Sequence, residues 1–298
     1  MFYVAAIGTG IITGLLCFIR ESRPSLLLVH EVSKLRETTG IITHQALNPD
    51  HTPDLHTFIC LALFRPLHLF FTEPIVFLVA IMSAVAFALI YLFTETLPPI
   101  YKSFGFTYKA ASLPFLAIGI GLIAGILTRL LDNRTLAKHH REGQPLVPED
   151  KLIGFSIGAP VLAGALWCFA WTVPPRVHGV HWLVSTIPLA FIGYALNEFD
   201  FVLAGYLADS YLSYAASGLA AVALLRSTMS AVFPLFGIQM FKALGTNVAI
   251  SILAALATLF CVVPRLFTQY GGRIRTRSKF AKHSLQVYQE NGVDKDGY

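Results

Sequence analysis

The chain has 298 residues, of which 55% are apolar and only 13% are charged, and its mean hydropathy is +0.64. Soluble domains carry roughly 25% charged residues, so the composition excludes an ordinary soluble protein and indicates a membrane protein with several spans. The formal net charge of +5 would suit a nucleic-acid-binding protein, but the basic residues are distributed as membrane topology requires. We therefore expect a lipid bilayer as partner and no nucleic acid.

Seven segments are long and apolar enough to cross a bilayer core, which takes about 20 residues. They are Phe2 to Ile19, Pro74 to Phe93, Ala111 to Leu131, Leu152 to Val173, Trp182 to Leu207, Tyr214 to Phe241, and Thr246 to Phe267. The predicted fold class is therefore an all-α membrane protein with seven transmembrane helices.

Lysine and arginine lie mainly in alternate connections between these segments. Seventeen of the 22 fall on one side of the membrane and four on the other, and Arg226 lies inside a span. Because cytoplasmic loops are enriched in Lys and Arg, the N-terminus is expected outside and the tail in the cytoplasm.

The connection from Arg20 to Glu73 is too long for a simple turn and contains two amphipathic pieces. Leu28, Val32 and Leu35 line one helix face. A second face consists of Leu55, Phe58, Ile59 and Ala62. Such faces favour helices that lie on the membrane surface, and a solvated linker is the alternative.

The predicted organisation is a transmembrane helix at 1–19, a cytoplasmic loop at 20–73, a six-helix bundle at 74–268 and a basic tail at 269–298.

Three glycine pairs at four-residue spacing occur inside the predicted spans. They are Gly10 with Gly14, Gly121 with Gly125, and Gly154 with Gly158. Small residues at this spacing let helix backbones approach closely. We interpret the pairs as packing positions within a bundle.

The sequence offers no convincing catalytic, metal or cofactor site. The segment Gly154 to Gly158 matches the GxSxG pattern of serine hydrolases, but that pattern requires a preceding strand, whereas here it opens an apolar helix. His178 and His181 lie roughly 33 to 37 Å from Ser156 along that span. A phosphate-binding loop is absent, and His139 and His140 lack a third ligand. We predict no enzyme activity, no metal and no cofactor.

Charged residues interrupt two predicted spans. Asn197, Glu198 and Asp200 lie in one, and Arg226 lies in the next. Residues two apart on a helix point about 200° apart, so the two acids cannot face the same site. Counted from the corner at Asp209, Glu198 is roughly 18 Å deep and Arg226 roughly 24 Å deep. We therefore expect Glu198 to pair with Arg226 in a substrate or proton pathway. Alternatively, the helix ends at Leu196 and the acids mark its cytoplasmic rim.

Several short blocks are similar to one family when taken together. They are Arg20-Glu21-Ser22-Arg23-Pro24-Ser25, Arg65-Pro66, Phe71 to Pro74, Pro148-Glu149-Asp150-Lys151-Leu152, Tyr206 to Tyr211 including Asp209, Tyr214 to Ser217, Leu225-Arg226-Ser227, and Phe233-Pro234-Leu235-Phe236. The combination resembles the fungal multidrug branch of the major facilitator superfamily, the twelve-span drug:proton antiporters. The chain departs from the family pattern at Asn197 to Asp200, where family members are mostly apolar.

The resemblance implies that the first span corresponds to the sixth helix of such a transporter and the last six spans to its C-terminal bundle. Helices one to five have no counterpart here, so a missing N-terminal half is an expected partner, and the chain alone is expected to be inactive. The implied function is export of drugs, toxins or other amphipathic or cationic compounds by proton antiport, in the plasma membrane. The alternative is a seven-span receptor, which a 54-residue first cytoplasmic loop disfavours.

Overall fold

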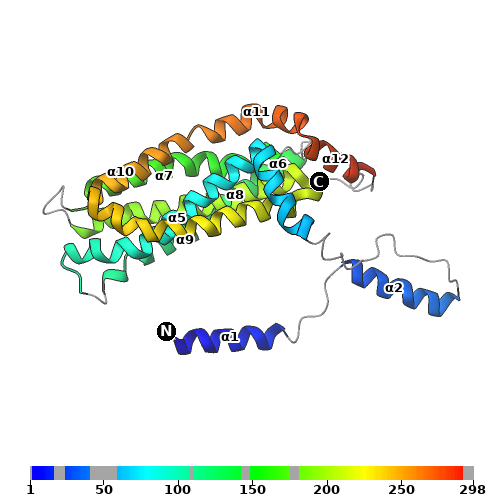
Figure 1. Cartoon of the computed structure of the whole chain (residues 1–298), viewed down its shortest axis with the longest axis horizontal. Coiled ribbons are helices and arrows are strands. Elements are labelled where there is room, and N and C mark those ends of the chain that lie inside the picture. The colour runs from blue at the N-terminus through cyan, green and yellow to red at the C-terminus, as the bar shows by residue number, and fades with distance from the viewer. Residues whose placement is uncertain are drawn as a thin grey trace. The chain divides into compact units, whose positions relative to one another are not determined.

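This computed structural model describes residues 2–16, 24–40, 59–107, 110–141, 148–174 and 181–290. All regular secondary structure in these ranges is helical. The chain divides into two compact units, Met1–Phe58 and Ile59–Tyr298, which can be followed by colour in Figure 1. The all-α fold class predicted from the sequence is confirmed for the described residues.

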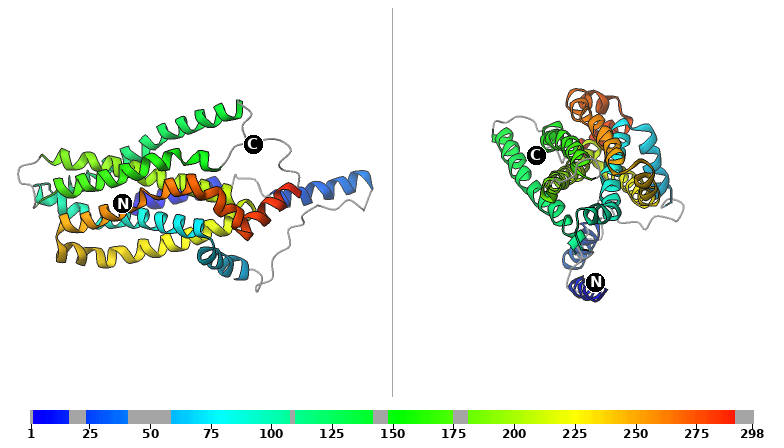
Figure 2. Two further views of the ribbon diagram at one scale, coloured as in Figure 1. Left: turned by 90° about the horizontal axis from the view of Figure 1, so that it is seen from above. Right: turned by 90° about the vertical axis from the view of Figure 1, so that its left-hand side faces the viewer.

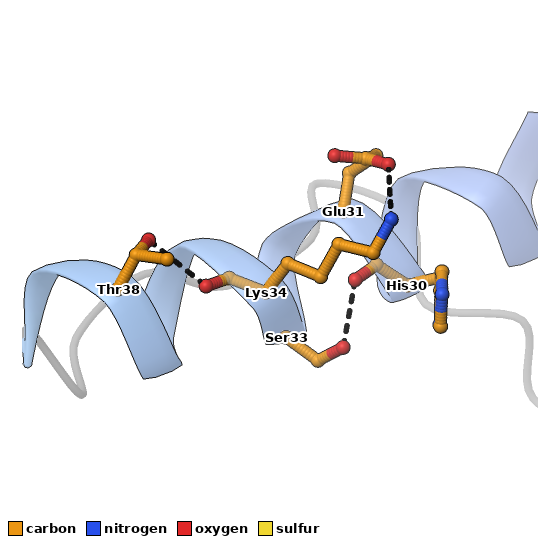
Figure 3. Close-up of polar contacts among 5 residues, drawn as sticks. All are labelled: His30, Glu31, Ser33, Lys34 and Thr38. Atoms are coloured by element: carbon orange, nitrogen blue, oxygen red, sulfur yellow. Dashed lines mark hydrogen bonds and ion pairs between the residues drawn. The ribbon is translucent and has the colours of Figure 1, made fainter.

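In the part of the first unit that the structure describes there are two helices, α1 (Phe2–Leu16) and α2 (Pro24–Thr39). Polar side chains of α2 bond along their own helix: Lys34 pairs with Glu31 at 3.2 Å, and the Ser33 hydroxyl donates to the carbonyl of His30 at 2.7 Å (Figure 3). The apolar residues Leu28 and Leu35 of the predicted amphipathic face are 45% and 49% exposed. This helix therefore presents an apolar surface that the unit itself does not cover.

The second unit is a bundle of long helices that run side by side (Figure 2). In chain order its elements are a π-helical turn η1 (Cys60–Phe64), α4 (Arg65–Thr72), α5 (Pro74–Ser103), η2 (Ala110–Ser112), α6 (Phe115–Arg141), η3 (Pro148–Leu152), α7 (Ile153–Thr172), α8 (Trp182–Tyr211), η4 (Leu212–Tyr214), α9 (Ala215–Leu244), α10 (Thr246–Phe260), α11 (Val263–Arg277) and α12 (Lys279–Glu290).

Helix α8 lies at the centre of this unit. It packs most extensively against α6 and α7 and also contacts α5 and α9. Helix α5 packs along α9, and α10 packs along α7. The core is almost wholly aliphatic and aromatic, with fully buried rings from Phe93, Phe155, Phe169 and Phe199. Any polar side chain on α8 is therefore enclosed by its neighbours unless it points toward a gap between them.

The predicted role of two glycine pairs in close packing is confirmed. A side chain at Gly121 of α6 would meet the backbone of Ala190 in α8, and one at Gly193 of α8 would meet the backbone of Ile118. These helices approach so closely that only hydrogen fits between them. Gly154 and Gly158 of α7 face α8 in the same way.

Among the described residues, five segments are long and apolar enough to span a membrane: Pro74–Ser103, Ala110–Leu130, Pro148–Thr172, Trp182–Leu244 and Thr246–Arg277. The fourth contains two helices, α8 and α9, joined at η4. The total of seven spans therefore stays a prediction. Helices α5, α6 and α8 run past the predicted span ends, because backbone hydrogen bonding continues where the side chains become polar. The last predicted span is interrupted at Cys261 and Val262.

Positive φ angles occur at both ends of α9, as well as at Gly105 after α5. Gly245, with φ +78°, turns the chain between α9 and α10, a conformation that glycine adopts without a steric cost. Leu212, with φ +37°, turns the chain between α8 and α9. The Ser284 hydroxyl of α12 donates to the carbonyl of Tyr211 and accepts from the amide of Ser213. Helix α12 therefore holds the Leu212 corner on both sides.

Candidate functional site: two charged clusters on helix α8

Helix α8 continues without a break through residues 197–200, so it does not end at Leu196. Glu198 is fully buried, whereas the side chain of Asp200 is 44% exposed. The two carboxylates have different partners on different helices. This arrangement confirms that the two acids do not share one site.

The Glu198 carboxylate is bound by α6. The Thr128 hydroxyl donates to Glu198 Oε1 at 2.9 Å, and Arg129 Nη2 lies 3.3 Å from the same oxygen. The Arg129 guanidinium also stacks 3.8 Å from the ring centroid of Phe201, a favourable arrangement for a cation over a ring face. The hydroxyl of Tyr194 lies 3.4 Å from Thr128 Oγ1. Two helices are thus joined through one buried ion pair.

Glycines on two helices make room for this carboxylate. A side chain at Gly154 of α7 would meet Glu198 Oε2, and one at Gly158 would come within 3.1 Å of Glu198 Cβ. On α6, a side chain at Gly125 would meet the amide of Asn197. We call Gly125, Gly154 and Gly158 the glycine cradle. It lets α6 and α7 close over an acid that no larger residues would accommodate.

Asp200 forms an ion pair with α9. Arg226 Nη1 donates to Asp200 Oδ1 at 3.0 Å, and the two side chains are 32% and 44% exposed. The Arg226 guanidinium lies 4.3 Å from the ring centroid of Phe87 on α5. Three helices therefore contribute to this pair, which stays accessible from one side.

A cavity of about 230 Å³ lies beside the Asp200–Arg226 pair. Ser83 of α5 also lines it; this residue is only 2% exposed, and its hydroxyl has no hydrogen-bond partner in the described part of the chain. The remaining lining side chains are small and aliphatic: Val79, Leu203, Ala204, Leu219, Val222 and Ala223. The cavity combines a charge pair, a free hydroxyl and apolar walls.

The expected pairing of Glu198 with Arg226 is wrong. Arg226 binds Asp200, and Glu198 binds Arg129. The depth estimate placed Glu198 and Arg226 within reach, but it did not include the rotation of α8. That rotation turns Glu198 toward α6 and α7 and turns Asp200 toward α9. Asn197 lies on the Glu198 side, against Gly125.

The chain is similar in sequence to known multidrug transporters. The multidrug transporter TPO1_2 of Candida glabrata is 34% identical over 283 residues, which are 94% of this chain and 48% of that protein. The major facilitator superfamily multidrug transporter FLU1 of Candida albicans is 33% identical over 265 residues, 88% of this chain and 43% of that protein. The chain is a homologue of the major facilitator multidrug transporters.

The chain spans about half the length of the curated relatives it matches. The efflux pump FUBT of Fusarium oxysporum is similar to the same extent, with 33% identity over 92% of this chain and 46% of that protein. No protein-family profile matches the chain, and no solved structure does. The partial coverage is consistent with the C-terminal part of such a transporter. The relatives and the apolar helices together support a multi-pass membrane protein.

Several of the motif positions meet at one end of the bundle, the end predicted to be cytoplasmic. Arg275 of α11 donates to both carboxylate oxygens of Glu149 in η3, at 2.8 and 2.6 Å. Lys151 pairs with Asp209 at 2.7 Å. These bonds join η3 to the ends of α8 and α11, so the motif residues Glu149 and Asp209 connect helix ends.

The remaining motif positions are dispersed. The Tyr211 hydroxyl donates to Glu73 at 2.9 Å; Ser217 and Pro234 lie along α9, and Pro148 begins η3. Pro24 and Ser25 begin α2, whereas Arg20, Glu21, Ser22 and Arg23 lie outside the described residues. Ser156 is exposed near the start of α7. Within the described ranges, no group of three or more His, Cys, Asp or Glu side chains could hold a metal ion.

Sequence reasoning missed Thr128, Arg129 and Ser83. Arg129 lies near the end of the predicted span Ala111 to Leu131, where a basic residue is typical of the membrane surface. The sequence does contain a signal for Thr128. Gly121, Gly125 and Thr128 lie at spacings of four and three residues, so they share one face of the helix, and Arg129 is the next residue. No sequence signal distinguished Ser83 from other small residues in α5.

Proposed function

We propose that this chain supplies the C-terminal part of a secondary active transporter that exports small amphipathic or cationic compounds by proton antiport at the plasma membrane. The observation that carries the proposal is the Asp200–Arg226 pair, which lines a cavity inside the bundle. Charges within transmembrane segments are expensive, and they usually mark ion or substrate pathways.

The Asp200–Arg226 pair has the chemistry that antiport requires. Asp200 can bind a proton or a cationic substrate but not both at once, because a protonated carboxyl has lost its negative charge. When neither is bound, Arg226 Nη1 donates a hydrogen bond to Asp200 Oδ1. Exchange of a proton for a cation at one carboxylate couples the two movements.

Glu198 has a different role in this proposal. It is fully buried and lies on the opposite side of α8 from the cavity. We assign it, with Asn197, to positioning α8 against α6 and α7. If α8 moved and displaced Asp200, then α6 and α7, which contain the glycine cradle, would move together with α8.

A second wall is required for a closed substrate cavity. In major facilitator proteins two halves face each other across a site at the membrane midplane. Helix α9 has a largely exposed surface, including Leu235 at 76% and Leu224 at 47%. An N-terminal half, on the same or another polypeptide, would supply the opposing wall.

The test is a fusion of this chain to the N-terminal half of the Candida glabrata relative, expressed in yeast that lacks its own multidrug pumps. Efflux of a fluorescent lipophilic cation is measured before and after a protonophore collapses the proton gradient. We expect efflux from the fusion, little from the chain alone, and loss of efflux with the protonophore.

Asp200→Asn in the fusion separates the assigned roles. A hydrogen bond to a charged group contributes about 1.5–3 kcal/mol, so loss of the charge should weaken cation binding about tenfold or more. The protein should still reach the membrane in normal amount. Unchanged proton-driven efflux in this variant would overturn the assignment of Asp200.

A further inference from the structure

A second cavity, of about 570 Å³, lies at the end of the bundle where α4 meets α12. We call it the headgroup pocket. Its walls come from two junctions far apart in the sequence, α4 with α5 and α11 with α12. The lining residues are His68, Thr72, Glu73, Pro74, Ile274, Arg277, Ser278, Lys279 and Phe280.

The pocket is held open by fixed contacts. The Ser278 hydroxyl caps α12 by accepting from the amide of Ala281 at 3.0 Å, and it donates to Glu73 Oε1 at 2.8 Å. The rings of His68 and Phe280 meet edge to face, with centroids 5.6 Å apart. A preformed pocket loses less conformational entropy when it binds a ligand.

The charges available at the pocket are cationic. The side chains of Arg277 and Lys279 are exposed, and neither has an ion-pair partner within the described part of the chain. Glu73, the acid in the pocket, is 5% exposed, and its two oxygens already accept hydrogen bonds from Ser278 and Tyr211. An anion entering the pocket would therefore meet two free cations and a satisfied acid.

The pocket lies beside the start of one candidate membrane span and the end of another. Pro74 begins α5, which is long and apolar enough to cross the membrane. Phe71, one turn before it on α4, is 77% exposed, and Phe64 is 60% exposed. Exposed aromatic side chains beside the end of a span are typical of the membrane interface. Basic pockets at the cytoplasmic interface recognise anionic lipid headgroups.

We propose that the headgroup pocket binds the phosphate headgroup of an anionic phospholipid, with Arg277 and Lys279 as its ligands. The bound lipid would connect α4 to α12, and so join the start of the bundle to its end. Because α12 also supports the Leu212 corner through Ser284, the lipid would stabilise the junction of α8 with α9. This inference does not depend on the transported substrate.

The test uses the full chain purified in detergent with short-chain phosphatidic acid as the probe. Bound lipids are counted by native mass spectrometry, and the melting midpoint is measured with and without the lipid. Arg277→Gln combined with Lys279→Gln should weaken binding roughly tenfold or more, because each charge contributes to attraction of an anionic headgroup. The lipid should raise the melting midpoint of the wild-type chain and leave that of the double variant unchanged.

Arg273→Gln combined with Lys242→Gln is the matched control. It removes the same net charge from two exposed residues that do not line the headgroup pocket, so lipid binding should change less than about twofold. Equal loss in both double variants would show only general electrostatic attraction and would overturn the proposal. Binding of inorganic phosphate with the affinity of the lipid would also overturn it, since the site would then recognise free phosphate.

Discussion

Glu198 and Asp200 are separated by a single residue on α8, yet they lie in opposite surroundings. Glu198 is enclosed by α6 and α7 and paired with Arg129, whereas Asp200 lines a cavity and pairs with Arg226 on α9. The same kind of side chain, two residues apart on one helix, therefore either closes a helix contact or lines a cavity. We propose that this difference in surroundings separates a packing role for Glu198 from a transport role for Asp200.

The largest effect is expected from closing the glycine cradle. Gly154→Leu would force a side chain into the Glu198 carboxylate, and overpacking together with disruption of a buried ion pair should cost at least about 3 kcal/mol. We expect little folded protein, measured by fluorescence-detected size exclusion of the tagged chain. Gly164→Leu on the same helix is the control, because a side chain there meets nothing within 4 Å.

Removal of the Arg129 charge should have the next largest effect. Arg129→Gln removes the cation that lies 3.3 Å from the buried Glu198 carboxylate, and breaking one partner of a buried pair costs about 3–5 kcal/mol. Adding Glu198→Gln should recover much of the lost stability, as judged by melting midpoints in a double-mutant cycle. Arg134→Gln, an exposed residue further along α6, should have almost no effect. A double variant no more stable than Arg129→Gln alone would contradict the pairing.

Breaking the Asp200–Arg226 pair should reduce efflux more than it reduces stability, in contrast to the Glu198–Arg129 pair. Because both side chains are about a third or more exposed, Arg226→Gln should cost less than about 1 kcal/mol of stability. Its efflux in the fusion protein should nevertheless fall, since the Asp200 carboxylate beside the cavity loses its hydrogen-bond donor. A large loss of stability with normal efflux would show that this pair belongs to packing, like Glu198.

Ser83→Ala should have the smallest effect. Ser83 is buried without a hydrogen-bond partner in the described residues, so its removal should change stability by no more than about 0.5 kcal/mol. Efflux should decrease only for compounds that can form a hydrogen bond to the hydroxyl. Comparing a hydrogen-bonding dye with a purely lipophilic cation measures that contribution. Equal changes for both dyes would exclude Ser83 from the substrate cavity.

Much of the architecture was readable from the amino-acid order. Apolar segments of bilayer length predicted the helices, because the hydrophobic effect and backbone hydrogen bonding both act locally along the chain. The glycine spacing in α6 and α7 predicted close packing, and the 200° rotation between Glu198 and Asp200 predicted that they face different sites. Each of these features depends only on residues within one helix.

The partners of the two acids were decided by tertiary structure. Arg129 and Arg226 both lay within plausible reach of α8, and the sequence favoured the wrong pairing for Glu198. The pairing depends on how far each helix is rotated and on which neighbour it packs against, and these are set by all the bundle contacts together. The headgroup pocket has the same origin, since its two walls are some 200 residues apart in the sequence, as the Ser278–Glu73 bond shows. Local sequence thus determined the helices and their faces, and long-range packing determined what each charge does.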